Sequence, residues 1–373
     1  MSSARQWLEQ LLERRDLSEL EAGSLLERLT DPELPPAMAG ALLTALRAKG
    51  VNAHEVRGFA RAMRALARRP ALPPGADGID IVGTGGDASG SLNLSTGAAL
   101  LTAACGLPVI KHGNRSITSR CGSADVIEAL GIALPLDEQR AADCYAATGF
   151  TFLFAPYFHP AMKALAPVRA ALGVRTVFNL LGPLTNPAAP RFHLIGAYDA
   201  ATAELLAHTV AGMPIERAWV VHGAAGWDEA TPIGPFLAFD VTPGAVRRLE
   251  IDPEALGFRR CVAADLQGGD AGVNRAALEA VFEGRDRGAH RDALLLQAGL
   301  ALHIAARAGS IGDGLEAAAA ALDSGRAAEW LAGLRRFGAQ SDAAQGGTAQ
   351  GGTAQSGTAQ SGAAQSGAAT VPR

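Results

Sequence analysis

The sequence predicts an α/β protein in which a small N-terminal all-helical domain precedes a large α/β domain with a mostly parallel central sheet flanked by helices. Two observations support this prediction. Up to about residue 70, apolar residues recur at helical spacing between helix start and stop signals. After a proline- and glycine-rich link at residues 70–78, short apolar runs alternate with longer helical segments, as parallel strands joined by helices do.

The first 70 residues carry start and stop signals for several helices. Two capping-box patterns precede apolar segments: Ser18 with Glu21, and Asn52 with Glu55. Pro36 suits the first turn of a further helix, which Gly50 can end. We therefore expect the helical domain to span residues 1–70.

The α/β domain is expected at residues 75–339. Its predicted strands are residues 79–82, 108–111, 152–154, 194–198, 218–221 and 236–241, and its last helices are residues 291–306 and 323–337. Sheets of this kind bind ligands at the carboxyl ends of their strands. The largely apolar segment 165–187 is expected to pack with the helical domain.

The last 34 residues, 340–373, are dominated by a Gly/Ser/Thr/Ala/Gln pentapeptide repeat without bulky apolar side chains. Such a segment cannot bury enough surface to offset its backbone entropy. We therefore expect residues 340–373 to be disordered and to lie outside the fold.

Composition argues against several classes of partner. The net charge is −4 and only 5% of residues are aromatic, which argues against nucleic acid as a ligand. The sequence has no apolar run of membrane-spanning length and no signal-peptide pattern at its start. Four scattered cysteines indicate neither a disulfide framework nor a zinc site. We expect a cytoplasmic protein without a membrane partner.

A strand, a loop dense in glycine and hydroxyl groups, and a helix start follow one another at residues 79–96. Gly83, Gly85 and Gly86 would let backbone N–H groups approach phosphate oxygens. Further donors near the helix N-terminus are Asn93, Ser95 and Thr96. The spacing matches neither a Walker loop nor a dinucleotide motif. A purely structural turn is an equal alternative, and the hydroxyl content favours phosphate binding.

A basic, glycine-containing loop occupies residues 111–125 after another predicted strand. Its cations and donors are Lys111, Arg115, Arg120, Asn114 and Ser119. Gly113 and Gly122 permit tight turns. A solvated basic loop is the alternative, and His112 alone is more often structural than catalytic.

Two further segments carry charge next to apolar sequence. Asp228 and Glu229 follow a strand, and adjacent carboxylates repel unless a cation such as Mg²⁺ lies between them. An acidic surface turn is the alternative. Arg169 and Arg175 interrupt an apolar segment and need an anionic partner, which for Arg175 is equally well an internal carboxylate.

These motifs in this order resemble the anthranilate phosphoribosyltransferase family, of the nucleoside-phosphorylase type II fold, over residues 5–338. The matching motifs are GTGGD, NLST, KHGNR, GSADVIEALG, RTVFNLLGPLTNP and the DE pair. The resemblance implies transfer of phosphoribosyl from phosphoribosyl pyrophosphate to anthranilate, as a step of tryptophan biosynthesis. It also implies Mg²⁺ and a homodimer formed through the helical domain.

The resemblance assigns site residues by position. For phosphoribosyl pyrophosphate they are Gly83, Gly86, Asp87, Ser91, Asn93, Leu94, Ser95, Thr96, Lys111, His112, Gly113, Asn114, Arg115, Ser119 and Ser123. For anthranilate they are Gly83, Asn114, Arg169 and His159, with His112 lining its path, and for magnesium Ser95, Asp228 and Glu229.

The sequence departs from the family pattern in a few places. Thr118 and Cys121 stand where serines are common, and Cys121 is a poor hydrogen-bond donor. Trp227 is bulkier than the usual residue before the acidic pair, and we expect it to pack against the sheet. The rival interpretations are a pyrimidine nucleoside phosphorylase, an enzyme for another aromatic amine, and an inactive relative that binds nucleic acid.

Overall fold

The computed structural model of the chain describes residues 3–116 and 120–348. Four helices open the chain: α1 (Ala4–Leu12), α2 (Glu19–Leu29), α3 (Pro36–Lys49) and α4 (Ala53–Ala65). Both capping boxes form, since Ser18 caps α2 and Asn52 caps α4 in reciprocal bonds with their glutamates. Pro36 begins α3, and Gly50 follows its last residue.

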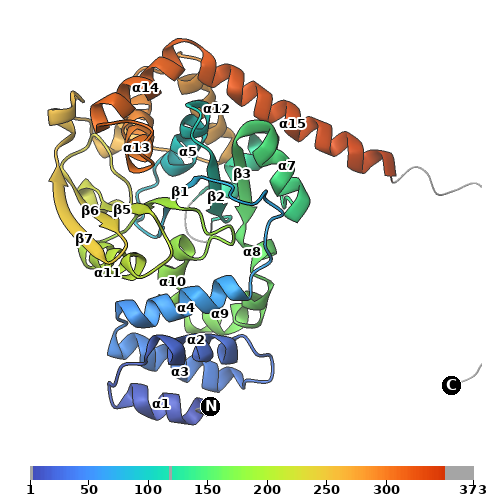
Figure 1. Cartoon of the computed structure of the whole chain (residues 1–373), viewed down its shortest axis with the longest axis vertical. Coiled ribbons are helices and arrows are strands. Elements are labelled where there is room, and N and C mark those ends of the chain that lie inside the picture. Colours follow the sequence, from blue (N-terminus) through green and yellow to red (C-terminus); the bar gives the residue numbers. More distant parts are fainter. Residues whose placement is uncertain (1–2, 117–119, 349–373) are drawn as a thin grey trace, which may run out of the picture.

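A seven-stranded sheet forms the centre of the rest of the chain (Figure 1). Its strands are β1 (Ile79–Gly83), β2 (Val109–Gly113), β3 (Phe150–Phe154), β4 (Phe192–Gly196), β5 (Arg217–His222), β6 (Phe236–Thr242) and β7 (Ala245–Ile251). The order is β3-β2-β1-β4-β5-β6-β7. The first five are parallel, whereas β6 runs antiparallel to β5 and to β7. The predicted fold class is confirmed.

Helices cover both faces of the sheet. The helices of this part of the chain are α5 (Leu94–Ala104), α6 (Ser123–Ala129), α7 (Glu138–Thr148), α8 (Ala155–Phe158), α9 (Ala166–Leu172), α10 (Phe178–Leu181), α11 (Ala200–Ala211), α12 (Ala271–Phe282), α13 (Ala289–Ile304), α14 (Ile311–Asp323) and α15 (Arg326–Thr348). Short 3₁₀ turns include η1 (Pro160–Ala164), η2 (Gly182–Leu184) and η3 (Ala224–Gly226). Among the described helices, none is long and apolar enough to cross a bilayer.

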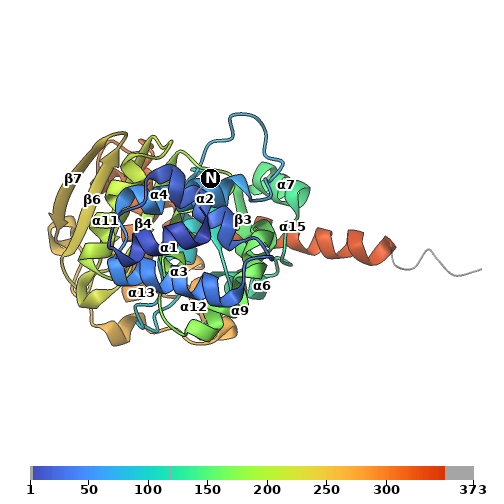
Figure 2. The same ribbon diagram turned by 90° about the horizontal axis from the view of Figure 1, so that it is seen from below.

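Successive strand residues feed two different hydrophobic cores, because side chains alternate across a sheet. Leu194 and Trp219 belong to the core shared with α5, α12, α13 and α14. Their neighbours Ile195 and Val220 belong to the second core, formed with α11 and the N-terminal helices. The helical bundle therefore shares a continuous apolar interior with one face of the sheet. Figure 2, seen from below, shows α1 to α4 in front of the α/β domain.

The segment 165–187 packs into this second core. Leu165, Val177 and Phe178 are buried there together with residues of α2, α3 and α4. The rings of Phe59 and Phe178 meet edge to face with centroids 6.2 Å apart. Gly40 of α3 faces Val168 and Leu172 of α9. The segment thus connects the carboxyl side of the sheet to the helical bundle.

Several details differ from the sequence-based prediction. Strand β2 ends at Gly113 rather than at residue 111, and β3 begins at Phe150 rather than at residue 152. The edge strand β7 was not predicted, because its exposed residues, among them Arg247, Arg248 and Glu250, do not form an apolar run. The fourth strand lies at Phe192–Gly196, two residues earlier than expected. The prediction of disorder from residue 340 is wrong for residues 340–348, which continue α15. An existing helix is extended without a new nucleation step, which offsets part of the low helix propensity of Gly346 and Gly347. Residues 349–373 lie outside the described part of the chain.

Candidate active site

The strand order reverses at β1, which has β2 on one side and β4 on the other. Ligands bind in such sheets where the order reverses, beyond the carboxyl ends of the strands. Gly83 ends β1 there and Gly196 ends β4 beside it. The glycine-rich loop leaves from Gly83 and enters α5 at Leu94.

The loop that follows β5 folds back onto these strand ends and carries Asp228 and Glu229. There is no room for a side chain at Gly83, the residue that precedes the loop, because a Cβ there would lie 2.2 Å from Asp228 Oδ2. At Gly196 a Cβ would lie 1.5 Å from the carbonyl oxygen of Asp228. Both glycines therefore admit the acidic pair to the end of the sheet. Trp227 is buried, as expected, in the core that the sheet shares with α5, α12, α13 and α14.

Backbone N–H groups of the glycine-rich loop donate to both carboxylates. The N–H of Gly85 donates to Asp228 Oδ2 at 2.6 Å, and that of Ser95 donates to Glu229 Oε1 at 3.0 Å. The hydroxyl of Ser91 lies 3.5 Å from Glu229 Oε2. The two predicted halves of the site, the loop and the acidic pair, are thus in direct contact.

Asp87 is the third carboxylate of this cluster, and the sequence analysis had assigned it only to substrate. Its Oδ2 accepts a bond from the N–H of Asp228 at 3.4 Å. Burial, then the charge of Asp87, raises the pKa of Asp228 to about 7. Burial and the two aspartates raise the pKa of Glu229 well above its usual value. A cation between these carboxylates would relieve their repulsion.

The carboxylates fit a magnesium ion that keeps waters or substrate oxygens among its ligands. No group of three acidic, histidine or cysteine side chains within residues 3–116 and 120–348 is arranged to enclose a metal alone. Magnesium commonly takes one or two carboxylates plus phosphate oxygens and waters. A cavity of about 10 Å³ beneath the pair, lined by Ser95 and Gln297, leaves room for about one water.

Lys111 lies beneath the same acidic cluster and is not exposed to solvent. Its ammonium donates to the carbonyl oxygen of Ile81, and the side chain is only 2% exposed. Burial lowers the pKa of Lys111, against the opposing charges of Asp80, Glu229 and Asp228. Its charge can therefore act on the site at short range, but its ammonium contacts the backbone of β1.

Several other predicted residues lie around the loop. Asn93 donates to the carbonyl oxygen of Cys121 at 3.1 Å and accepts from Asn274 at 2.7 Å. No sequence pattern indicates Asn274 as a partner. Ser123 begins α6 and donates to the carbonyl oxygen of Asn114 at 3.2 Å. Together these bonds join the glycine-rich loop to the basic loop.

Three predicted contacts are not supported by the side-chain positions. Leu94 and Thr96 are both fully buried, which leaves only their backbone for a ligand. Arg115 forms ion pairs with Glu128 and Asp125 on the outer face of α6. Gly86 lies in the glycine-rich loop, as predicted, whereas Gly113 is the last residue of β2 and not part of the basic loop. Thr118 and Ser119 lie outside the described residues.

Two protein-family models match this chain, and many relatives identify the same family. Residues 5–67 match the helical bundle domain of the glycosyl transferase family, and residues 75–328 match its a/b domain. The anthranilate phosphoribosyltransferase of Rubrobacter xylanophilus is 47% identical, covering 86% of this chain and 92% of that protein. The one from Methylobacterium nodulans is 46% identical, covering 88% and 96%. The chain belongs to the anthranilate phosphoribosyltransferase family. The resemblance inferred from the six motifs is confirmed.

Solved structures of the family have the same fold. The anthranilate phosphoribosyltransferase of Thermus thermophilus superposes with a TM-score of 0.83 at 40% identity, covering 89% of this chain and 99% of that one. The Saccharomyces cerevisiae enzyme, described in complex with phosphoribosyl pyrophosphate and Mg, gives a TM-score of 0.82 at 25% identity, covering 90% and 98%. Membership in this family disfavours the phosphorylase and nucleic-acid alternatives.

Several residues that the family resemblance assigns to anthranilate binding lie on the side of the site that faces the helical bundle. Arg169 of α9 is half-buried and stacks over the ring of Phe178 at 5.2 Å. Burial lowers its pKa, and it makes no ion pair within the described residues. His112 and His159 are buried with ring centroids 5.1 Å apart, and His112 Nδ1 lies 3.1 Å from the carbonyl oxygen of Gly182.

Three buried histidines predict acid sensitivity of the fold. Burial lowers the pKa of His112 and His193 to about 3 and that of His159 to about 4. The unfolded chain therefore takes up protons first as the pH falls below about 6.5, and each histidine lowers the free energy of unfolding by about 1.4 kcal/mol per pH unit. Above pH 6.5 their contribution is complete; it is lost progressively down to the folded pKa.

Urea unfolding at pH 7, 6 and 5 measures this dependence. We expect the unfolding free energy of His193→Asn to fall less steeply below pH 6 than that of wild type, by about 1.4 kcal/mol per pH unit, because one buried neutral histidine is removed. The buried carboxylates Asp80 and Asp228, whose pKa values are raised, contribute the opposite slope in both proteins, so the difference between the two proteins isolates His193. An unchanged slope in His193→Asn would contradict the assignment of His193 as a buried neutral base.

Proposed function

We propose that this protein transfers the phosphoribosyl group of phosphoribosyl pyrophosphate to the amine of anthranilate, giving N-(5-phosphoribosyl)anthranilate and pyrophosphate in tryptophan biosynthesis. The observation that carries this proposal is the contact between the glycine-rich loop and the buried acidic cluster at the reversal point of the sheet. The names of the relatives and the Saccharomyces cerevisiae complex support the same substrates and magnesium.

In this proposal Asp228, Glu229 and Ser95 hold Mg²⁺ together with diphosphate oxygens. When bound, the ion would neutralise the charge of the diphosphate group. N–H groups of the loop that are not engaged by the carboxylates would bind phosphate oxygens at the N-terminus of α5. The buried charge of Lys111 adds to this stabilisation, since pyrophosphate leaves with increased negative charge on its oxygens.

Arg169 is the proposed partner of the anthranilate carboxylate. Its guanidinium is half-buried and stacked on Phe178, which restricts its orientation. The aniline nitrogen of anthranilate is neutral at pH 7, so correct placement against the ribose matters more than a strong base. His112 and His159 are neutral at this pH and would line the path of the aromatic ring.

Arg175 is expected to fix the glycine-rich loop for its substrate. Its guanidinium donates to the carbonyl oxygen of Gly86 and stacks over Tyr198 at 4.2 Å. Its own carbonyl oxygen accepts from Arg47 of α3. We predict that Arg175→Ala raises KM for phosphoribosyl pyrophosphate about tenfold, because one charge-assisted hydrogen bond to the loop is lost. Steady-state kinetics with each substrate varied tests this, and a change confined to anthranilate would contradict it.

A homodimer through the helical bundle and a cytoplasmic location complete the proposal. Leu12 of α1 and Leu20 of α2 are 62% and 85% exposed, which suits burial against a second copy. We predict that Leu20→Asp shifts the protein from dimer to monomer in sedimentation equilibrium, whereas Val273→Asp on α12 leaves the mass unchanged. A wild-type mass of one chain would refute the dimer.

The charged phosphoribosyl substrate does not cross bilayers, which supports a cytoplasmic location for the protein.

Loss of anthranilate fluorescence tests the activity directly. Purified protein mixed with Mg²⁺, phosphoribosyl pyrophosphate and anthranilate should consume anthranilate and release pyrophosphate in equal amounts. Omitting phosphoribosyl pyrophosphate provides the control. Absence of any fluorescence change, with and without metal, would refute the proposed function.

A further inference from the structure

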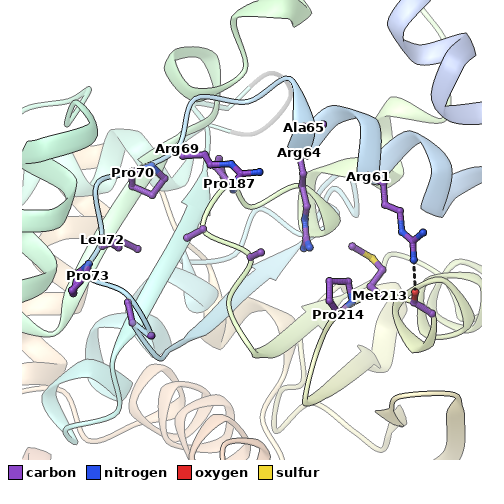
Figure 3. Close-up of a pocket in the computed structure, with 15 residues that line it drawn as sticks. Arg61, Arg64, Ala65, Arg69, Pro70, Leu72, Pro73, Pro187, Met213 and Pro214 are labelled. Atoms are coloured by element: carbon purple, nitrogen blue, oxygen red, sulfur yellow. Dashed lines mark hydrogen bonds between the residues drawn. The ribbon is translucent and has the colours of Figure 1, made fainter.

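A cavity of about 790 Å³ lies at the opposite, amino-terminal edge of the sheet (Figure 3). Its walls are the C-terminal turn of α4, the linker that precedes β1, residues 187–189 before β4, and residues 212–214 before β5. The helical bundle thus supplies one side and the α/β domain the other. The length of β1, five residues, separates this edge from the acidic cluster, which corresponds to about 16 Å.

Three arginines and no carboxylates line this cavity: Arg61, Arg64 and Arg69. Arg61 already has partners, because it pairs with Glu19, which Arg57 shares, at 2.6 Å and donates to the carbonyl oxygen of Gly212 at 3.1 Å. The cavity therefore holds two further positive charges that its own lining does not balance.

The guanidinium groups of Arg64 and Arg69 make no hydrogen bond or ion pair with the residues that the structure describes. The Nε–H of Arg64 is buried without an acceptor. Burial lowers the pKa of Arg64 to about 10, which the more distant charge of Asp80 only partly offsets. A desolvated guanidinium without a partner is unfavourable, and a bound anion relieves that cost. Figure 3 shows Arg64 descending into the cavity and Arg69 lying across Pro187.

We infer that this cavity is a second binding site, for a small phosphate-bearing anion, and that the bound anion links the helical bundle to the α/β domain. Guanidinium groups bind phosphate through several parallel hydrogen bonds, which suits the pair Arg64 and Arg69. The remaining wall, which includes Pro70 and Met213, is apolar and suits an organic group attached to the phosphate. The volume is within the range of metabolite-binding pockets.

Thermal unfolding with inorganic phosphate tests the inference. The substrate loop also binds phosphate, so wild type is compared with Arg64→Gln/Arg69→Gln and with the matched control Arg68→Gln. Arg68 is exposed, lies outside the cavity and pairs with Glu138 at 3.7 Å. We expect wild type and the control to give the same stabilisation by phosphate, and the double variant to need at least tenfold more phosphate for it. An equal response of all three proteins would overturn the inference.

A second measurement locates the anion without relying on the stability of the double variant. Crystals of the wild-type protein soaked with selenate should show an anomalous peak between Arg64 and Arg69. A peak only at the glycine-rich loop, or none, would overturn the inference. The anion at this site is either an organic phosphomonoester or free phosphate, and the binding of phenyl phosphate distinguishes the two. Tighter binding of phenyl phosphate than of inorganic phosphate assigns the site to a phosphomonoester, and equal binding assigns it to free phosphate.

Discussion

Replacing Asp228 with Asn or Glu229 with Gln is expected to lower kcat/KM for phosphoribosyl pyrophosphate by about 100- to 1000-fold, the range found when one preorganised stabilising group is lost. Each substitution keeps the shape of the side chain and removes its charge. Both carboxylates are only 8% exposed and are held by loop N–H groups, so their positions relative to the loop are fixed. The loss should be partly recovered at high Mg²⁺, because the other carboxylate and Ser95 remain as proposed ligands.

The same substitutions should leave the fold intact or stabilise it. Three carboxylates that repel one another in a buried cluster lower the stability of the metal-free protein, and a neutral amide relieves this repulsion. Thermal unfolding without metal therefore separates catalytic loss from misfolding. The matched control Glu283→Gln, on an exposed surface turn, should change neither property. Full activity in Asp228→Asn/Glu229→Gln would refute the proposed magnesium site.

The sequence predicted both halves of this site because each half follows a strand. The carboxyl ends of parallel strands share one edge, so the loop after β1 and the acidic pair after β5 had to meet. Asp87 was not recognised as part of the acidic cluster, because that requires knowing that the β5 loop folds back over β1 and β4. The close approach at Gly83 and Gly196 makes this possible, and nothing local in the sequence reports it.

The direction of individual side chains was less predictable than their position. Lys111 and His112 are neighbours in β2 and necessarily point to opposite faces of the sheet. Lys111 lies beneath the acidic cluster, whereas His112 faces Gly182 and His159 on the side of the helical bundle. Leu94 and Thr96 face the core because they occupy the buried side of α5. A motif match fixes residue identity but not which backbone or side-chain atom meets the ligand.

The charge balance at the amino-terminal edge of the sheet was invisible in the sequence. In the sequence, Arg64 is an ordinary cation near the end of a helix and Arg69 is one in a linker. Their isolation follows only from the packing of α4 against segments far away along the chain, which brings no carboxylate into the cavity. Net charge and motif order report nothing about such local imbalance.

Arg169→Ala is expected to raise KM for anthranilate by about 10- to 100-fold, the equivalent of a lost charge-assisted hydrogen bond of about 1.5–3 kcal/mol. KM for phosphoribosyl pyrophosphate should change less than twofold, because Arg169 lies on α9, outside the glycine-rich loop. Lys163→Ala, which removes an exposed cation from the neighbouring turn η1, is the matched control. Both constants come from steady-state kinetics with each substrate varied in turn.

The split between the two constants decides the role of Arg169. Its ring contact with Phe178 belongs to the interface between α9, α10 and the helical bundle, so a purely structural role would disturb the whole cleft. Both KM values would then rise together and the unfolding temperature would fall. A rise confined to anthranilate, with partial recovery in Arg169→Lys, follows only if the cation meets the carboxylate of that substrate, since lysine keeps the charge and loses the planar fork.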